Sequence, residues 1–269
     1  MSATIESQVY TAFDAAVVVQ KQRDYFATGK TKDVEFRIQQ LKKLRQLVVD
    51  NEQNITDALK KDLNKSKMEA FGTEIGFLIA DIDHTLKSIR SLVKPRKAKT
   101  PLFHQLGSSW VQADPYGVTY IIAPWNYPFQ LALSPVVGAI SAGNTCVIKP
   151  SELSENTTNL LEKLINNNFE EGFLKVLVGG VNESKALLDE RFDYIFFTGG
   201  TEIGRYIYQQ AAKFLTPVTL ELGGKSPCFV DETFNTNWGI KRLVWGKFTN
   251  TGQTCVAPDY VLVDKKVKQ

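Results

Sequence analysis

A thiol and a carboxylate each lie beside glycine-containing backbone in the C-terminal half of the 269-residue sequence. Cys255 ends the segment 252–255, where it follows two polar residues, and Glu221 begins the segment 221–225. A thiolate is a strong nucleophile, and a carboxylate can take a proton from an attacking water. Because a polar loop with a glycine is a good place for an accessible thiolate, these two residues are candidates for nucleophilic catalysis.

The other cysteines indicate packing and not chemistry. Cys146 lies in an apolar, strand-like run and Cys228 follows a proline, so we expect both to fill the core. Three cysteines far apart do not make a disulfide framework, and they suit a reducing cytosol. Because the sequence has only two histidines, His84 and His104, it offers little for a histidine-rich metal site or a serine–histidine relay, and we predict no metal.

An asparagine is held between prolines in the segment 123–128, directly after a strand-like run. Pro124 and Pro128 stiffen the backbone around Asn126, and Pro128 suits the first position of a helix. Asn126 is then open to two interpretations. It can cap the helix with its side chain, or it can aim its amide NH₂ group at a developing oxyanion.

The loop after the next strand-like run carries opposite charges. Lys149 and Glu152 flank Pro150 and Ser151, and together they could grip a sugar diol through a cation and a carboxylate. An ordinary capped loop, with Ser151 near the start of a helix, explains the same residues equally well. On these residues alone, both interpretations stay open.

A glycine turn follows the strand-like run 194–197. Such a turn, placed between a strand and a helix, leaves backbone N–H groups free for a phosphate. Measured against the pattern G-x-G-x-x-G, Gly199 and Gly204 match, whereas Thr201 replaces the middle glycine. Taken alone, the turn is a weak signal for a dinucleotide.

The elements that must position these loops change in kind along the chain. Up to about residue 90, apolar residues recur at helical spacing, and the sequence predicts packed helices. The proline-bracketed basic segment 94–101 is interpreted as a solvated linker. The segments 109–113 and 118–123 are predicted to form a hairpin, because Asp-Pro-Tyr-Gly at 114–117 suits a type I turn.

Strands and helices alternate after this point. The predicted strands are 118–122, 145–148, 175–178, 194–197, 219–222 and 228–230, and the predicted helices are 128–142, 155–168, 183–190, 202–213 and 238–247. Short apolar strands alternating with helices indicate an α/β fold with a doubly wound parallel sheet. Ligands bind at the carboxyl ends of such strands, where the loops described above are expected to lie.

Composition excludes several classes of protein. Hydrophobic residues make up 43% and charged residues 23% of the sequence, which is unlike a disordered, collagenous or coiled-coil chain. The net charge, 32 − 29 = +3, is too small to make nucleic acid the default partner. The N-terminus does not resemble a targeting peptide, and the uncharged segment 115–148 is too interrupted by prolines and glycines for a membrane span. We therefore expect a cytoplasmic protein.

Five segments, in the same order, resemble the aldehyde dehydrogenase superfamily. They are Pro124-Trp-Asn-Tyr-Pro128, Lys149-Pro-Ser-Glu152, Phe197-Thr-Gly-Gly-Thr-Glu-Ile-Gly204, Glu221-Leu-Gly-Gly-Lys225 and Gly252-Gln-Thr-Cys255. The form of the first segment, Gly-Gly-Thr in the turn, and Cys-Val-Ala-Pro-Asp-Tyr from Cys255 onward resemble the class 3 or fatty-aldehyde branch. The resemblance runs from about Phe36 to Val263 and implies a Rossmann-like cofactor domain preceded by helices.

The resemblance also implies catalytic roles. Cys255 would attack the aldehyde carbonyl, and the side-chain amide of Asn126 with the backbone N–H of Cys255 would hold the oxyanion. Hydride transfer to the nicotinamide would leave a thioester, and Glu221 would activate the water that releases the acid. The substrate implied is an aliphatic aldehyde of medium to long chain.

Further residues are implied to bind NAD, with NADP as an alternative. Lys149 and Glu152 would hold the adenosine ribose, and Glu152 would favour NAD by repelling a 2′-phosphate. Trp125 and the glycine turn would serve the pyrophosphate. The full set of implied cofactor residues is Trp125, Lys149, Ser151, Glu152, Gly199, Gly200, Thr201, Gly204 and Leu222.

The family continues well beyond its nucleophile, whereas this sequence ends fourteen residues after Cys255. We therefore expect residues 1–221 to form the N-terminal helices and the cofactor domain, and residues 222–269 to begin a second, incomplete α/β catalytic domain. The resemblance implies a homodimer for a full-length form and leaves room for a C-terminal membrane tail. The alternative is a non-catalytic fragment that binds a dinucleotide.

Overall fold

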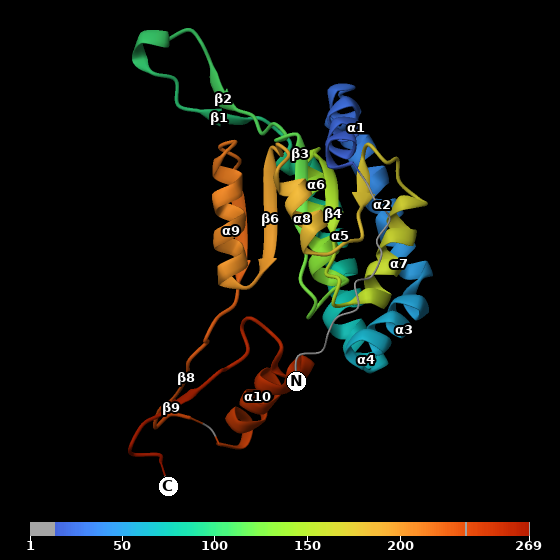
Figure 1. Ribbon diagram of the computed structural model, residues 1–269. Helices are drawn as coiled ribbons and strands as arrows, with labels where there is room; N and C mark the ends of the chain where they lie inside the picture. The colour runs from blue at the N-terminus through green and yellow to red at the C-terminus, as the bar shows by residue number, and fades with distance from the viewer. Residues whose placement is uncertain (1–13, 235, 269) are drawn as a thin grey trace.

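A parallel sheet forms the centre of the computed structural model, which describes residues 14–234 and 236–268. Within these residues, five strands pair side by side in the order β5-β4-β3-β6-β7, and every pairing is parallel (Figure 1). Their bounds are β3 Val118–Ile122, β4 Thr145–Lys149, β5 Leu174–Val176, β6 Tyr194–Gly199 and β7 Val218–Leu222.

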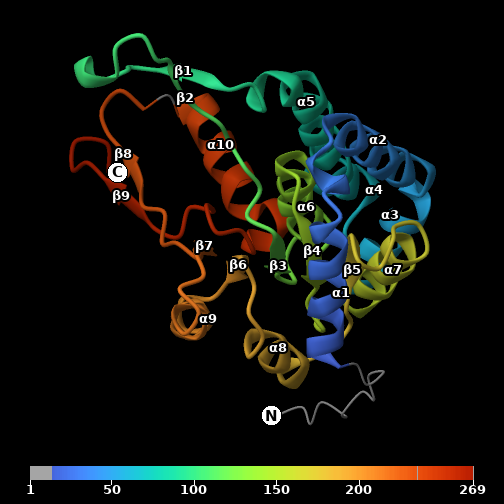
Figure 2. The same ribbon diagram turned by 90° about the horizontal axis from the view of Figure 1, so that it is seen from above.

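Helices cover both faces of the sheet (Figure 2). One layer consists of α1 Ala15–Ala27, α8 Val181–Leu188 and α9 Thr201–Ala212; the other consists of α2 Val34–Asp50, α5 Gly76–Leu92, α6 Gln130–Ala142 and α7 Glu155–Asn166. Because side chains alternate along a strand, Tyr120 and Val147 enter the first core, whereas Ile121 and Ile148 enter the second. The predicted α/β fold with a doubly wound parallel sheet is confirmed.

The N-terminal helices follow the predicted apolar spacing. The remaining helical elements here are η1 Lys30–Lys32, α3 Glu52–Leu63, α4 Lys67–Ala70 and the π-helical turn η2 Phe71–Ile75. Leu41 and Leu44 of α2 and Leu78 of α5 are fully or almost fully buried in the shared core. The start of the chain, residues 1–13, on which the targeting prediction rests, lies outside the described residues.

The predicted hairpin between 109–113 and 118–123 is wrong. Strand β2, Ser109–Val111, instead pairs antiparallel with β1, Arg96–Ala98, so the basic segment interpreted as a linker contains a strand. A short helical turn, η3 Leu102–His104, joins β1 to β2, and this arm projects away from the helices (Figure 1). The reason is burial: β3 is buried at every position and pairs on both sides within the parallel sheet.

The C-terminal segment forms a separate small unit. Strand β8, Cys228–Val230, has the bounds predicted for this strand and pairs in parallel with β9, Val261–Val263, apart from the five-stranded sheet. Between them lie α10 Thr236–Phe248 and η4 Thr249–Gly252. Figure 1 shows this unit beyond the carboxyl end of β6. The proposed domain boundary after residue 221 remains a prediction.

The uncharged segment 115–148 contains β3, helix α6 and most of β4. The helix lies against the sheet and against α5, and Leu133, Val136 and Ile140 are buried there. Among the helices that the described ranges contain, none is long and apolar enough to cross a membrane.

Candidate active site

A large cavity opens where the strand-end loops meet. Its volume is about 1290 Å³. Of the residues predicted for catalysis or cofactor binding, those that line it are Trp125, Asn126, Gly199, Gly200, Glu221, Leu222 and Cys255. The chain reverses the order of its strands between β3 and β6, and the loops that follow those two strands diverge at that point. This is the place where α/β sheets bind ligands, so the topology accounts for the location of the cavity.

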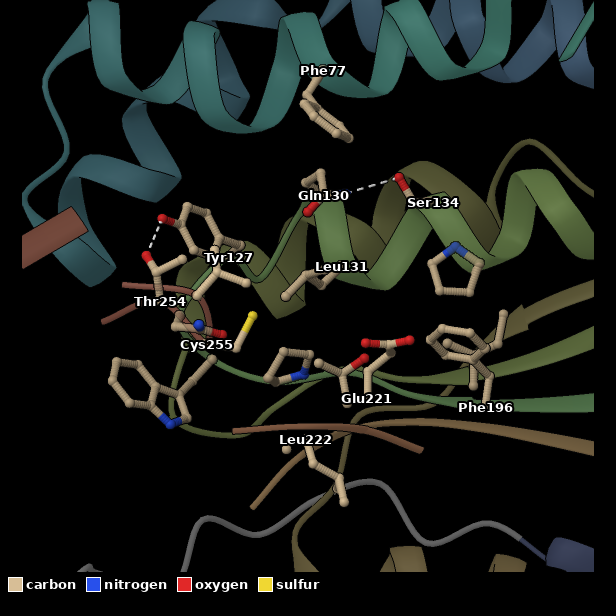
Figure 3. Close-up of a pocket in the computed structure, with 18 of the residues that line it drawn as sticks. Phe77, Tyr127, Gln130, Leu131, Ser134, Phe196, Glu221, Leu222, Thr254 and Cys255 are labelled. Carbon is tan, nitrogen blue, oxygen red and sulfur yellow. Dashed lines mark hydrogen bonds between the residues drawn. The ribbon is translucent and has the colours of Figure 1, made fainter. Parts of the chain in front are cut away.

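Cys255 reaches the cavity from a strained turn. Asn250, Thr251 and Gly252 of η4 all have positive φ, at 53°, 58° and 79°. Such a conformation is unusual for a β-branched threonine, and strain of this kind persists only where surrounding contacts hold it. Cys255 is solvent-exposed, and its sulfur turns toward Leu131 inside the cavity (Figure 3).

Asn126 joins the β3–α6 loop to the cysteine loop. Its side-chain Nδ2 donates to the backbone oxygen of Gln253, two residues before Cys255, at 2.8 Å. Asn126 is not the helix cap, because α6 begins at Gln130 and Phe129 occupies the N-cap position. An amide NH₂ group has two hydrogens, so one remains available to an oxyanion near Cys255.

Glu221 is the carboxylate nearest the end of β7. Its side chain is exposed and lies in the same cavity as the Cys255 thiol (Figure 3). Tyr127 also lines the cavity, and its hydroxyl makes a 2.5 Å hydrogen bond with the hydroxyl of Thr254, the residue before Cys255. The structure therefore brings an exposed thiol, an amide donor and a carboxylate to one cavity.

The charged loop after β4 lies outside the cavity lining. Lys149 Nζ and Glu152 Oε2 form a 2.7 Å ion pair, and the lysine side chain is 5% exposed. Ser151 is buried, and its Oγ accepts a hydrogen bond from Leu153 N at 3.3 Å within the loop; it does not cap α7, whose N-cap is Ser154. The loop is tied to the active site because Ser154 Oγ donates to the carbonyl of Trp125 at 2.9 Å.

The glycine turn divides into an open part and a packed part. Gly200 is the N-cap of α9, and a Cβ atom there would meet nothing within 4 Å. At Gly204, a Cβ atom would come within 2.8 Å of the Leu222 side chain, so this glycine permits close packing of α9 on β7. Thr201 begins α9 and is exposed. Neither Thr201 nor Gly204 lines the cavity.

The three cysteines differ in burial. Cys146 is in the core and Cys255 is exposed, as the sequence predicts, but the prediction that Cys228 fills the core is wrong. Cys146 is completely buried, and burial raises the pKa of its thiol to about 12. Cys228 is half-buried on the small β8–β9 unit and is not a core residue. Across the described residues, no group of three or more His, Cys, Asp or Glu side chains is placed to hold a metal ion.

Sequence reasoning missed a buried network beneath the Asn126 loop. Lys65 and Glu74 form an ion pair there, and Asn250 Nδ2 donates to the Asn126 carbonyl at 2.8 Å. One signal for Glu74 was present, because it stands among Phe71, Ile75 and Leu78 on an apolar helical face. Lys65 and Asn250 carry no comparable signal, since each lies among other polar residues.

Comparison with known proteins identifies the class. The family described as "Aldehyde dehydrogenase family" matches residues 2–269, and the chain belongs to that family. The family expectation drawn from the five segments is confirmed.

Individual relatives point to the class 3 branch. The chain is 44% identical to aldehyde dehydrogenase family 3 member A2 of Rattus norvegicus, over 91% of this chain and 51% of the relative. It is 45% identical to the "dimeric NADP-preferring" aldehyde dehydrogenase of Canis lupus familiaris, over 93% of this chain and 55% of the relative. The chain thus spans about half the length of the curated relatives it matches.

A solved structure with the same fold is described as the substrate-bound state of Staphylococcus aureus AldH. It superimposes with a TM-score of 0.93 at 45% identity, over 96% of this chain and 56% of that chain. The parallel sheet and its flanking helices are therefore those of an aldehyde dehydrogenase.

Proposed function

We propose that the protein containing this chain oxidises an aliphatic aldehyde of medium to long chain to the carboxylic acid, with NAD or NADP as the acceptor. The observation that carries the proposal is the convergence of Cys255, Asn126 and Glu221 on one cavity. These residues come from three separate loops, and their types suit covalent catalysis on a carbonyl.

In the first step, the Cys255 thiolate attacks the aldehyde carbon and forms a thiohemiacetal. The free amide hydrogen of Asn126 and the backbone N–H of Cys255 stabilise the oxyanion that develops on the carbonyl oxygen. A bound nicotinamide supplies the acceptor for the hydride, and the acyl group then remains on the Cys255 sulfur as a thioester. Covalent attachment thus divides a difficult oxidation into two easier steps.

In the second step, Glu221 takes a proton from a water molecule. That water adds to the thioester carbon, and the acid leaves as the thiol is regenerated. The exposed position of Glu221 in the same cavity gives it access both to solvent and to the acyl group. Glu221 therefore favours hydrolysis over transfer of the acyl group to another thiol.

The residues around the glycine turn fit a dinucleotide. Helix α9 begins directly after its N-cap Gly200, where no side chain crowds the backbone, so the N–H groups of its first turn can meet a pyrophosphate. Trp125 lies on the same cavity. The Lys149–Glu152 pair, in the loop that is hydrogen-bonded to the Trp125 carbonyl through Ser154, would hold the adenosine ribose. Leu222 would contact the nicotinamide half of the dinucleotide. The dog relative is described as NADP-preferring, so both dinucleotides are proposed.

The apolar wall of the cavity supports an aliphatic substrate. Phe77, Leu131, Trp245 and Val256 contribute side chains to the lining. An alkyl chain buried against such side chains is released from water, at about 25 cal/mol per Å² of apolar surface. A homodimer is proposed for the whole protein, in line with the description of the dog relative as dimeric. A cytoplasmic location is proposed from the three widely separated cysteines, which suit a reducing compartment.

Replacement of the nucleophile tests the proposal. In the full-length protein, Cys255→Ala should abolish the rise in 340 nm absorbance with NAD and an aliphatic aldehyde, while dinucleotide affinity is retained. The matched control is Cys228→Ala, which alters a half-buried thiol outside the cavity and should keep turnover. Near-normal turnover of Cys255→Ala would show that Cys255 is not the nucleophile.

The second candidate is a non-catalytic dinucleotide-binding fragment. It is favoured by the apolar side chains that the C-terminal unit leaves exposed, among them Trp245 at 74% and Phe248 at 64%. Preorganised catalysis needs a rigid surrounding, and we expect these 269 residues alone to show little turnover and a tendency to associate. Turnover of the isolated chain above about 1 s⁻¹, the low end for enzymes, would contradict this expectation.

A further inference from the structure

A buried ion pair lies beneath the loop that carries Asn126. Lys65 Nζ and Glu74 Oε1 are 2.5 Å apart, and their side chains are 1% and 0% exposed. Lys65 precedes α4, whereas Glu74 belongs to the π-helical turn η2, a type of turn that is frequent at functional sites. Since desolvation offsets much of the attraction in such a pair, its contribution to stability does not explain its presence.

Both members of the pair also bind the Asn126 loop. Glu74 Oε2 accepts hydrogen bonds from the backbone N–H groups of Phe129 at 2.8 Å and Gln130 at 3.1 Å. Lys65 Nζ donates to the backbone oxygen of Asn126 at 3.2 Å and stands 4.2 Å from the ring centre of Tyr127. The backbone is therefore fixed at Asn126 itself and again three and four residues later.

The same helical segment also holds the cysteine loop. Glu69 Oε1 of α4 accepts from the backbone N–H of Asn250 at 3.0 Å, and Asn250 Nδ2 donates to the Asn126 carbonyl. The Asn126 carbonyl oxygen thus accepts hydrogen bonds from both Lys65 and Asn250. Two loops more than a hundred residues apart in sequence meet on a single carbonyl oxygen.

We propose that Lys65 and Glu74 are positioning residues, which hold the amide of Asn126 at the correct place relative to the Cys255 thiol. The inference rests on the proposed function. Neither residue lines the cavity, so both act through the Asn126 backbone and not on the substrate. A misplacement of about 1 Å can reduce a rate roughly 100-fold, so this fixation bears directly on catalysis.

The double variant Lys65→Met/Glu74→Gln isolates this effect in the full-length protein. The glutamine oxygen can still accept from the two backbone N–H groups, and no buried charge is left without a partner. The bond from Lys65 to the Asn126 carbonyl is lost. We expect the thermal midpoint to stay within a few degrees of the wild-type value, and kcat for aldehyde oxidation to fall about 10- to 100-fold with KM changed less than about threefold.

Two reactions of the same thiol separate positioning from general damage. Iodoacetamide alkylates Cys255 by displacement of iodide and forms no oxyanion. With p-nitrophenyl acetate, the thiolate adds to the ester carbonyl, an oxyanion forms, and nitrophenolate leaves as the thioester is made. We expect acylation to slow about 10- to 100-fold and alkylation of Cys255, followed by peptide mass spectrometry, to change less than about twofold.

The control is Asp83→Asn. It removes the 2.6 Å ion pair with Arg45 between α2 and α5, away from both loops, and should leave both thiol reactions unchanged. Lys65→Met alone removes the same bond to the Asn126 carbonyl, should show the same selective loss, and replaces the double variant if that protein does not fold. Equal loss of both reactions, or no loss of either, would overturn the inference.

Failure of the proposed function has a different signature. If wild-type and Cys255→Ala proteins oxidise aldehyde equally, the proposed function is wrong. The ratio of acylation to alkylation at Cys255 still reports whether Lys65 and Glu74 position Asn126, because neither thiol reaction uses a dinucleotide.

Discussion

Replacing Asn126 with alanine should separate the chemical role of its amide from its structural role. Among the residues that the structure describes, the side chain donates one hydrogen bond, to Gln253 O at 2.8 Å, in a partly buried setting. Loss of such a bond costs about 1 kcal/mol of stability, which shifts the thermal midpoint by a few degrees at most. Loss of one oxyanion donor costs about 2.7–4 kcal/mol of transition-state stabilisation, or roughly 100- to 1000-fold in kcat.

The assay is steady-state formation of NADH at 340 nm by the full-length protein with saturating aldehyde. We expect Asn126→Ala to lower kcat far more than its small loss of stability explains. Asn126→Asp is the isosteric comparison: its carboxylate cannot donate and would face the Gln253 carbonyl, so its kcat should be at least as low. A kcat for Asn126→Ala within about tenfold of wild type would refute the assignment of its amide to the oxyanion.

Three further outcomes can be measured. Glu152→Gln removes the carboxylate that repels a 2′-phosphate and frees Lys149, so the NAD/NADP affinity ratio from binding titrations should narrow; an unchanged ratio would remove Glu152 from the ribose site. Because burial raises the pKa of Cys146 to about 12, iodoacetamide at pH 8 should label this thiol only after denaturation, and mass spectrometry of the native protein should find it unmodified. The hydrogen bond from Arg45 lowers the pKa of Asp83, so the pair stabilises the fold above the unfolded value of about 4 and this contribution is lost as the pH falls through the lower folded value. The difference in thermal midpoint between wild type and Asp83→Asn should then shrink steadily as the pH is lowered below about 4; a difference that stays constant would contradict the reasoning.

Most of the strand positions could be read from the sequence because buried strands are short, continuous apolar runs. The strand 118–122 matches β3 at both ends, since all five of its residues are buried between two helical layers. The sequence predicts less well which strands pair with one another. The Asp-Pro-Tyr-Gly segment satisfies the local rules of a turn, but local rules do not record that β2 finds β1 instead. Strand 228–230 has its partner at 261–263, a pairing that no local pattern encodes.

The candidate site divides along the same line. Asn126 and Cys255 stand in distinctive loops, Glu221 stands near the end of the predicted strand 219–222, and the topology of a parallel sheet brings such strand ends together. The buried residues that hold the Asn126 loop in place could not be predicted in this way. Lys65 stands in a run of lysines and polar residues, and only tertiary contact distinguishes it from a solvated surface charge. A sequence shows which groups can react, whereas the contacts that aim them depend on distant segments.

The left-handed run at 250–252 also determines when the thiol loop can form during folding. Its two anchors lie far away along the chain: the acceptor for Asn250 N is 181 residues earlier, and the acceptor for its side chain is 124 residues earlier. Contacts of such long range form late, because the entropy of closing the intervening chain must be overcome first. During synthesis, Cys146 can enter its strand while Cys255 is still part of an unorganised segment. Cys255 therefore acquires its environment only after the helical layers around the sheet have assembled, so an incompletely folded molecule carries this thiol without the Asn126 loop beside it.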